Sequence, residues 1–137
     1  MAAFSNFLEQ ALLEYTLNGG ATGGQSTVFI ALFTDASTDD DSSTEVGGGL
    51  GYARQSVAGG DWTIADAGGG QWVATNDNDI EFGPNTVSDW GAINGIGVYD
   101  LVSGGNLLYH GTPTSVRTVQ VGDVYRINAG SFTIELR

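Results

Sequence analysis

Apolar residues near the N-terminus recur with the period of an α-helix. Between residues 3 and 20 the apolar positions share one helix face, and they are Phe4, Phe7, Leu8, Ala11, Leu12 and Tyr15. Asn6 followed by Glu9 resembles a capping box at the start of this helix, and Asn18-Gly19-Gly20 predicts its end. Because a helix of about four turns is marginal on its own, we expect the apolar face to pack against this domain or a neighbouring chain.

After residue 20 the apolar pattern changes to the period of β-strands. Residues 27–34 form a continuous apolar run rich in β-formers, which predicts a strand covered on both faces. Further short runs predict strands at 52–57, 61–65, 71–75, 79–82, 93–100, 106–110, 116–120, 124–128 and 131–136. The last two runs predict a hairpin, because Asn128-Ala129-Gly130 supplies a glycine where a three-residue turn needs a left-handed residue.

This succession predicts a mainly β protein, namely a single β-sandwich of jelly-roll type with one N-terminal α-helix. The 137 residues suit one domain, with the helix and a linker in residues 1–20 and the β-sandwich in residues 21–137. The sequence contains neither a membrane-spanning apolar run nor the basic and apolar segments of a secretory signal. We therefore expect a soluble protein that is made in the cytoplasm and not exported.

The charge is strongly one-sided, with 16 acidic residues, four arginines and a formal net charge of −12. Affinity for nucleic acids and for anionic membranes comes mostly from cationic groups, so we expect neither as a partner. The chain has no cysteine, which excludes disulfides, thiolate chemistry and zinc sites built on cysteine.

Acidic residues cluster in residues 34–46, which we call the acidic loop. Its weak candidate metal ligands are Asp35, Asp39, Asp40, Asp41 and Glu45, whose hard oxygens would suit calcium. The spacing lacks the alternating pattern of a helix-loop-helix calcium site, so a solvated surface loop is the favoured interpretation, without a bound cofactor. We expect residues 34–51 to form one mobile excursion, kept extended by repulsion between its aspartates, that contacts a neighbouring protein or a cation.

Glycines dominate residues 47–51, yet the segment does not fit a phosphate-binding loop. It leads into an aromatic and β-friendly run rather than a helix, and the chain has no lysine for a phosphate. The glycines are therefore expected to be structural. Arg54 follows them, and its planar fork is expected to pair with a nearby carboxylate.

His110 is the only histidine, so any histidine general base or serine hydrolase triad would have to use it. Its place near the end of a predicted strand favours a packing role. No other group of residues in the sequence indicates a catalytic site, so the sequence predicts that the protein is not an enzyme. Trp62, Trp72 and Trp90 could stack on sugars, although core or subunit-interface positions are the favoured interpretation.

The order of several segments resembles a family of small virion proteins of tailed bacteriophages. The resemblance covers almost the whole chain and rests on the segments NFLEQALLEYTLNG, TVFIALFT, GGGLGYARQSV, IEFGPNTVSDWGAINGIGVYDLVSGGNLLYHG and TVQVGDVYRINAGSFTIEL. Proteins of this kind are described as phage tail-fibre proteins, and related small acidic β proteins are capsid decoration, or cement, proteins. The resemblance implies a virion structural role and supplies no catalytic residue.

Two positions in the virion follow from the resemblance. A decoration protein would lie on the outer surface of the head shell, bind the major capsid protein and form a homotrimer. A tail-fibre or tail-tip module would instead bind a glycan or protein of the host surface. The short chain without heptads or fibrous repeats favours decoration. The residues expected at interfaces are Phe4, Phe7, Leu8, Leu12, Tyr15, Arg54, Trp62, Trp72 and Trp90.

Overall fold

The structure, a computed structural model, describes residues 2–18, 26–69 and 71–136. Its helical elements are α1 (Asn6–Asn18) and the short 3-10 turns η1 (Gly48–Leu50) and η2 (Gly59–Asp61). Its strands are β1 (Ala2–Phe4), β2 (Thr27–Phe33), β3 (Gln55–Ala58), β4 (Trp62–Asp66), β5 (Trp72–Asn76), β6 (Ile80–Phe82), β7 (Gly91–Ile93), β8 (Gly95–Tyr99), β9 (Leu107–Gly111), β10 (Arg117–Val119), β11 (Tyr125–Ile127) and β12 (Thr133–Leu136). No described helix is long and apolar enough to cross a membrane.

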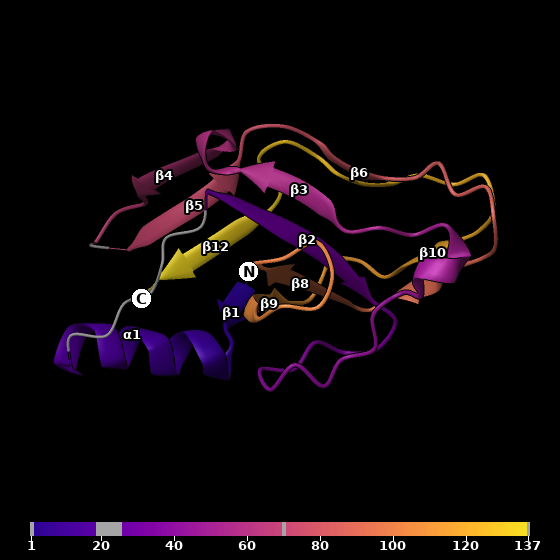
Figure 1. The fold of residues 1–137 in the computed structure, drawn as a ribbon. Coiled ribbons are helices and arrows are strands. Elements are labelled where there is room, and N and C mark those ends of the chain that lie inside the picture. Colours follow the sequence, from indigo (N-terminus) through magenta and orange to yellow (C-terminus); the bar gives the residue numbers. More distant parts are fainter. Residues whose placement is uncertain (1, 19–25, 70, 137) are drawn as a thin grey trace.

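Eight strands form one sheet in the order β3-β2-β8-β9-β1-β12-β5-β4, and β10-β7 and β11-β6 form two short ribbons. The sheet is nearly closed, so the architecture lies between a sandwich and a barrel, and α1 lies along its lower side in Figure 1. The prediction of a mainly β, sandwich-like fold with one N-terminal helix is confirmed. Gly19-Gly20, expected to end the helix, and the linker that follows lie outside the described residues.

The N-terminus contributes a strand that the sequence did not predict. β1 lies between β9 and β12, and Ala2 is opposite both Gly111 and Ile134. The helix therefore begins after Phe4, and its cap is Ser5, whose Oγ accepts a hydrogen bond from the Leu8 amide at 3.3 Å. The capping box expected at Asn6 was wrong, because the buried Ser5 is also held in place by its own hydrogen bond to the Leu107 carbonyl.

The predicted hairpin of residues 124–128 and 131–136 was also wrong. β11 pairs with β6, whereas β12 pairs with β5 and β1. The buried side chain of Asn76 separates them: its Nδ2 donates to the Asn128 carbonyl at 3.1 Å, and its Oδ1 accepts from the Phe132 amide at 2.9 Å. These bonds replace ladder contacts at the turn, so the two strands diverge into different sheets.

A further difference concerns the run 93–100, which forms two strands rather than one. Asn94 separates β7 from β8, and its amide donates to the Phe33 carbonyl at 2.9 Å. Its side-chain Nδ2 donates to the Thr34 carbonyl at 2.8 Å. The polar residue Asn94 therefore interrupts the predicted strand, and its contacts with the end of β2 hold the break in place.

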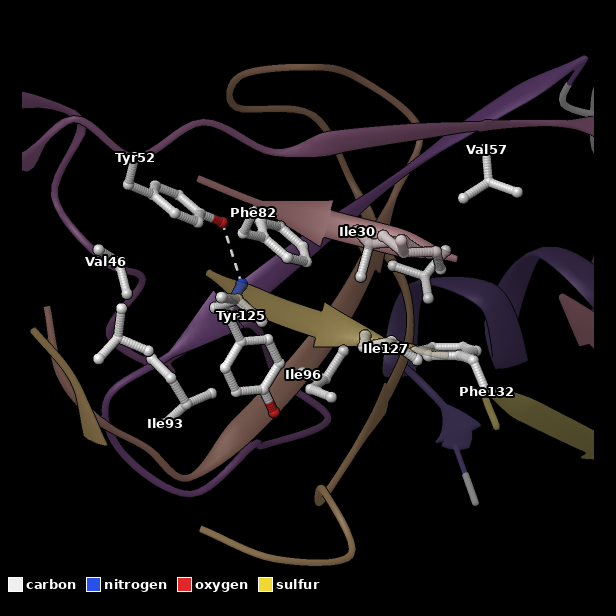
Figure 2. Close-up of a cluster of buried hydrophobic side chains, with 14 of the residues drawn as sticks. Ile30, Val46, Tyr52, Val57, Phe82, Ile93, Ile96, Tyr125, Ile127 and Phe132 are labelled. Atoms are coloured by element: carbon white, nitrogen blue, oxygen red, sulfur yellow. Dashed lines mark hydrogen bonds between the residues drawn. The ribbon is translucent and has the colours of Figure 1, made fainter. Parts of the chain in front are cut away.

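One hydrophobic cluster fills the space enclosed by the sheet (Figure 2). Ile30, Leu32 and Phe82 are fully buried within it. The Phe82 ring stacks on Tyr52 at 6.1 Å between centroids and meets Tyr125 edge-on at 6.2 Å. Aromatic pairs at these distances add stability beyond the burial of their apolar area.

Replacing Asn76 tests the junction between β11 and β12. Asn76→Ala leaves the Phe132 amide without its acceptor, which costs about 1–3 kcal/mol, and it also removes the hydrogen bonds that the side chain donates to the Asn78 and Asn128 carbonyls. We expect the free energy of unfolding in urea to fall by roughly 3 kcal/mol in all. The control is Asn78→Ala, an exposed position expected to change it by less than about 0.5 kcal/mol. Equal effects of the two substitutions would contradict this account of the junction.

Candidate functional site

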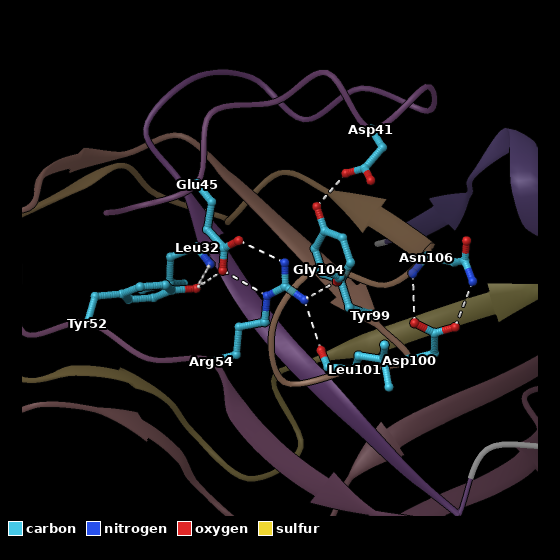
Figure 3. Close-up of polar contacts among 10 residues, drawn as sticks. All are labelled: Leu32, Asp41, Glu45, Tyr52, Arg54, Tyr99, Asp100, Leu101, Gly104 and Asn106. Atoms are coloured by element: carbon cyan, nitrogen blue, oxygen red, sulfur yellow. Dashed lines mark hydrogen bonds and ion pairs between the residues drawn. The ribbon is translucent and has the colours of Figure 1, made fainter. Parts of the chain in front are cut away.

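Arg54 lies at the centre of a polar network that joins three loops at one end of the sheet (Figure 3). Its Nε and Nη2 donate to the two carboxylate oxygens of Glu45 at 2.9 and 2.8 Å. Its Nη1 donates to the carbonyls of Leu101 and Gly104 at 2.9 and 2.8 Å, and its guanidinium lies 3.6 Å from the centre of the Tyr99 ring. The predicted pairing of Arg54 with a carboxylate is confirmed, and the side chain is only 6% exposed.

Two tyrosines extend this network. The Tyr52 hydroxyl accepts from the Leu32 amide at 3.0 Å and donates to Glu45 at 2.8 Å, while the Tyr99 hydroxyl donates to Asp41. Burial, reinforced by the nearby carboxylate, raises the pKa of Tyr52 and of Tyr99 well above the ordinary value near 10. Both hydroxyls therefore remain protonated at neutral pH and act as donors.

The acidic loop is folded back on the sheet rather than extended. The Thr34 amide donates to the Thr44 carbonyl at 2.9 Å, and the Val46 amide donates to the Leu32 carbonyl at 3.1 Å. Near its tip, the Asp39 carbonyl accepts from the Asn6 amide of α1 at 2.9 Å. The expectation that repulsion extends the loop was wrong, because hydroxyl and amide donors meet its carboxylates and offset their mutual repulsion.

Four of the five carboxylates of the acidic loop accept hydrogen bonds from protein donors. Asp35 accepts from the Thr44 amide at 2.7 Å and Asp40 from the Ser42 hydroxyl at 2.6 Å, and these hydrogen bonds hold the pKa of both aspartates below the usual value. Asp41 and Glu45 belong to the Arg54 network. Within the described ranges, no group of three Asp, Glu or His side chains is placed to hold a metal ion.

The glycine segment 47–51 turns the chain from the acidic loop into β3. Gly51 has a φ of 77°, and a Cβ at this position would lie 2.8 Å from Cγ2 of Val87. Glycine is therefore required here by both backbone and packing. The carbonyl of neighbouring Leu50 accepts from Trp90 Nε1 at 2.8 Å, so the segment also anchors a core tryptophan.

The structure separates the expected interface residues into accessible and internal groups. Phe7 on α1 is 46% exposed and Trp72 on β5 is 52% exposed. Trp90 is buried, as is the Arg54 side chain, and Trp62 packs edge-on against Phe132. The remaining candidates are Phe4, which packs on Tyr109 from β1, the half-buried Leu8 and Leu12, and Tyr15, whose side chain lies outside the described residues. That these residues form an interface stays a prediction.

His110 lies on β9, half-buried, with its Nδ1 3.1 Å from the Ser37 hydroxyl of the acidic loop. This contact joins the acidic loop to the sheet at a second point, away from Arg54. A serine beside a histidine could in principle act as nucleophile and base, but that chemistry also needs an orienting group and an oxyanion site. The observed contact links the acidic loop to β9 through Ser37 and His110.

Sequence reasoning missed a groove between residues 111–117 and 125–133. Its cavity volume is about 290 Å³, and two of the four arginines, Arg117 and Arg126, line it. These arginines lie nine positions apart on different ribbons, so no local pattern joins them. The scarcity of positive charge in this sequence was the one signal that could have drawn attention to them.

Removing the buried arginine tests the network directly. Arg54→Met leaves Glu45 with only the Tyr52 hydroxyl as donor and removes the donor to two carbonyls, and breaking a buried ion pair typically costs about 3–5 kcal/mol. Because Glu45 is 27% exposed and can be partly hydrated, we expect the free energy of unfolding to fall by about 3 kcal/mol.

The matched control for this substitution is Arg126→Met. Arg126 pairs with Glu81 on the surface, where the two side chains are 50% and 46% exposed. A pair of this kind contributes at most about 1 kcal/mol. Both free energies of unfolding are measured by urea denaturation. If Arg54→Met lowers this free energy as little as Arg126→Met does, the network does not stabilise the fold.

Comparison with known protein families matches residues 3–135 to the family described as podophage GP4 fiber I protein gp80. No curated protein matches the chain. The match begins in β1 and ends in β12, so it includes α1, the Arg54 network and every strand of the sheet. The predicted resemblance to virion structural proteins of phages is thereby confirmed. The chain belongs to the podophage GP4 fiber I protein gp80 family, whose members are virion components.

Proposed function

We propose that this protein is a non-enzymatic subunit of the virion fibre and takes part in contact with the host surface. The observation that carries the proposal is the match to a fibre family over residues 3–135, a range that begins in β1 and ends in β12. The proposed role needs a stable body that presents loops in fixed positions, and the fold is consistent with this need.

The use of charge in the fold supports a structural role. The Arg54 guanidinium makes four hydrogen bonds within the chain, and Arg126 donates to Glu81 at 2.7 Å. The single histidine contacts a serine of the acidic loop. These groups support loops and strands, and we propose no reaction for any of them.

We further propose that copies of the chain associate as a homotrimer. Large apolar side chains are exposed in two places: Phe7 and Leu17 of α1 are 46% and 77% exposed, and Ile64 and Trp72 of the edge pair β4-β5 are 68% and 52% exposed. Exposed apolar clusters of this kind are common at subunit interfaces, and α1 and β4 are the elements we expect a second copy to cover.

The second candidate function is capsid decoration through the major capsid protein. A single globular body without heptads or fibrous repeats favours it, because extended fibre shafts usually contain such repeats. The acidic loop would then be the element that contacts the head shell. This candidate differs from the first in the position and number of copies on the particle.

Cryo-electron microscopy of purified virions, combined with quantitative mass spectrometry, distinguishes the two functions. A fibre subunit is expected at the tail in a few copies per particle, grouped about a threefold axis. The major capsid protein and a known tail protein, measured in the same digest, calibrate the copy number. Hundreds of copies on the head would contradict the fibre proposal and favour decoration, and copies without threefold grouping would contradict the homotrimer.

A further inference from the structure

The groove beside β11 has the composition of a binding site. One wall is the segment 111–117 and the other is β11 with the turn that follows it. The lining residues on its rim carry hydroxyl and amide groups, and they include Thr112, Thr114, Ser115, Asn128 and Ser131. Apolar side chains of Ile96, Ile127 and Phe132 also line it. None of the lining residues is acidic, although the chain as a whole carries a formal charge of −12.

Tyr125 supplies a hydroxyl group to this groove, which it lines. Its side chain is almost wholly buried, with 2% of the residue exposed, and its ring packs edge-on against Phe82. Figure 2 shows its hydroxyl pointing away from the Phe82 ring, on the side of Ile96, which lines the groove. This hydroxyl has no hydrogen-bond partner among the described residues, and since none of their buried side-chain polar atoms lacks one, it is accessible to solvent. A ligand in the groove can therefore bond to it without displacing a partner from the protein.

Arg117 supplies a positive charge at the same place. Its guanidinium lies 4.3 Å from the centre of the Tyr125 ring, and its Nη2 donates to the Arg126 carbonyl at 2.7 Å. Among the described residues Arg117 has no carboxylate partner. Arg126, in contrast, is paired with Glu81, and its Nε lies 4.0 Å from Oδ2 of Asp79. Arg117 is thus held in position by neutral groups and keeps its charge for another anion.

We propose that this groove binds an acidic saccharide, with the carboxylate or phosphate of the sugar on Arg117 and a ring oxygen on the Tyr125 hydroxyl. Sugars combine hydroxyl groups with apolar C–H faces, and the groove offers rim hydroxyls beside an apolar surface. Arginine recognises carboxylates and phosphates through paired donors. A volume of about 290 Å³ is at the small end of ligand sites, which suits one or two sugar rings.

This inference deepens the proposed contact with the host surface and rests on it for its biological setting. It also differs from the less favoured alternative that a tryptophan stacks on a sugar, because Trp72 lies on β5 and does not line the groove. The two ideas place the sugar at different sites, so a variant at each position can separate them.

The experiment titrates the isotope-labelled protein with three probes, D-glucuronic acid, glucose 6-phosphate and glucose, and follows backbone amide shifts by NMR. We expect at least one of the two acidic sugars to bind in the millimolar range, with shifts in residues 111–117 and 125–133, and glucose to bind more weakly. Binding of glucuronic acid alone identifies a carboxylate ligand, and binding of glucose 6-phosphate alone identifies a phosphate ligand.

Two substitutions test the assigned contacts. Tyr125→Phe removes only the hydroxyl, and we expect it to weaken binding of the acidic sugar roughly three- to tenfold, the equivalent of one hydrogen bond. Because that hydroxyl has no partner in the described structure, the melting temperature should not fall. Arg117→Gln should abolish the preference for the acidic sugar over glucose. Tyr109→Phe and Trp72→Ala, which alter an aromatic residue outside the groove, should leave the affinity unchanged.

The proposal is overturned if neither acidic sugar shifts the groove residues, if Tyr125→Phe binds as tightly as the parent protein, or if Trp72→Ala is the variant that loses binding. These outcomes are independent of the virion measurements. A protein located on the tail that fails the titration retains its proposed function and loses only this site. A protein located on the head loses the fibre proposal, while the titration still decides the chemistry of the groove.

Discussion

The ion pair between Arg54 and Glu45 determines how one whole end of the molecule is arranged. A buried guanidinium is costly unless its donors are satisfied, and here four hydrogen bonds satisfy it. Those bonds reach the acidic loop through Glu45 and the turn between β8 and β9 through Leu101 and Gly104. One side chain just before β3 therefore fixes two loops that lie far apart in the sequence.

The same pair connects the surface to the core and to the helix. Glu45 accepts from Tyr52, whose ring stacks on Phe82 in the core. The acidic loop that Glu45 anchors reaches α1 through the hydrogen bond from Asn6 to Asp39. These contacts hold the acidic loop, with its carboxylates, in one conformation. A virion protein needs such a fixed loop conformation if the loop is to bind a partner at a fixed position.

The sequence predicted the parts of this structure that local chemistry decides. The apolar run of β2 and the carboxylate partner of Arg54 followed from residue type alone. β1 and the junction at Asn76 could not be predicted, because they depend on pairing between distant segments, such as Ala2 with Ile134. The groove was missed for the same reason, since Tyr125 and Arg117 meet only after two separate ribbons have formed.

Amide hydrogen exchange of the intact protein, followed by NMR, tests most directly whether the acidic loop belongs to the folded body. The amides of Asn6, Thr34, Thr44 and Val46 each donate a hydrogen bond that closes the loop or joins it to its neighbours. If the Arg54 network holds the loop on the sheet, these amides will exchange nearly as slowly as those of β2 and β8. Exchange as fast as that of an unstructured peptide would show that the loop is detached and would contradict the account.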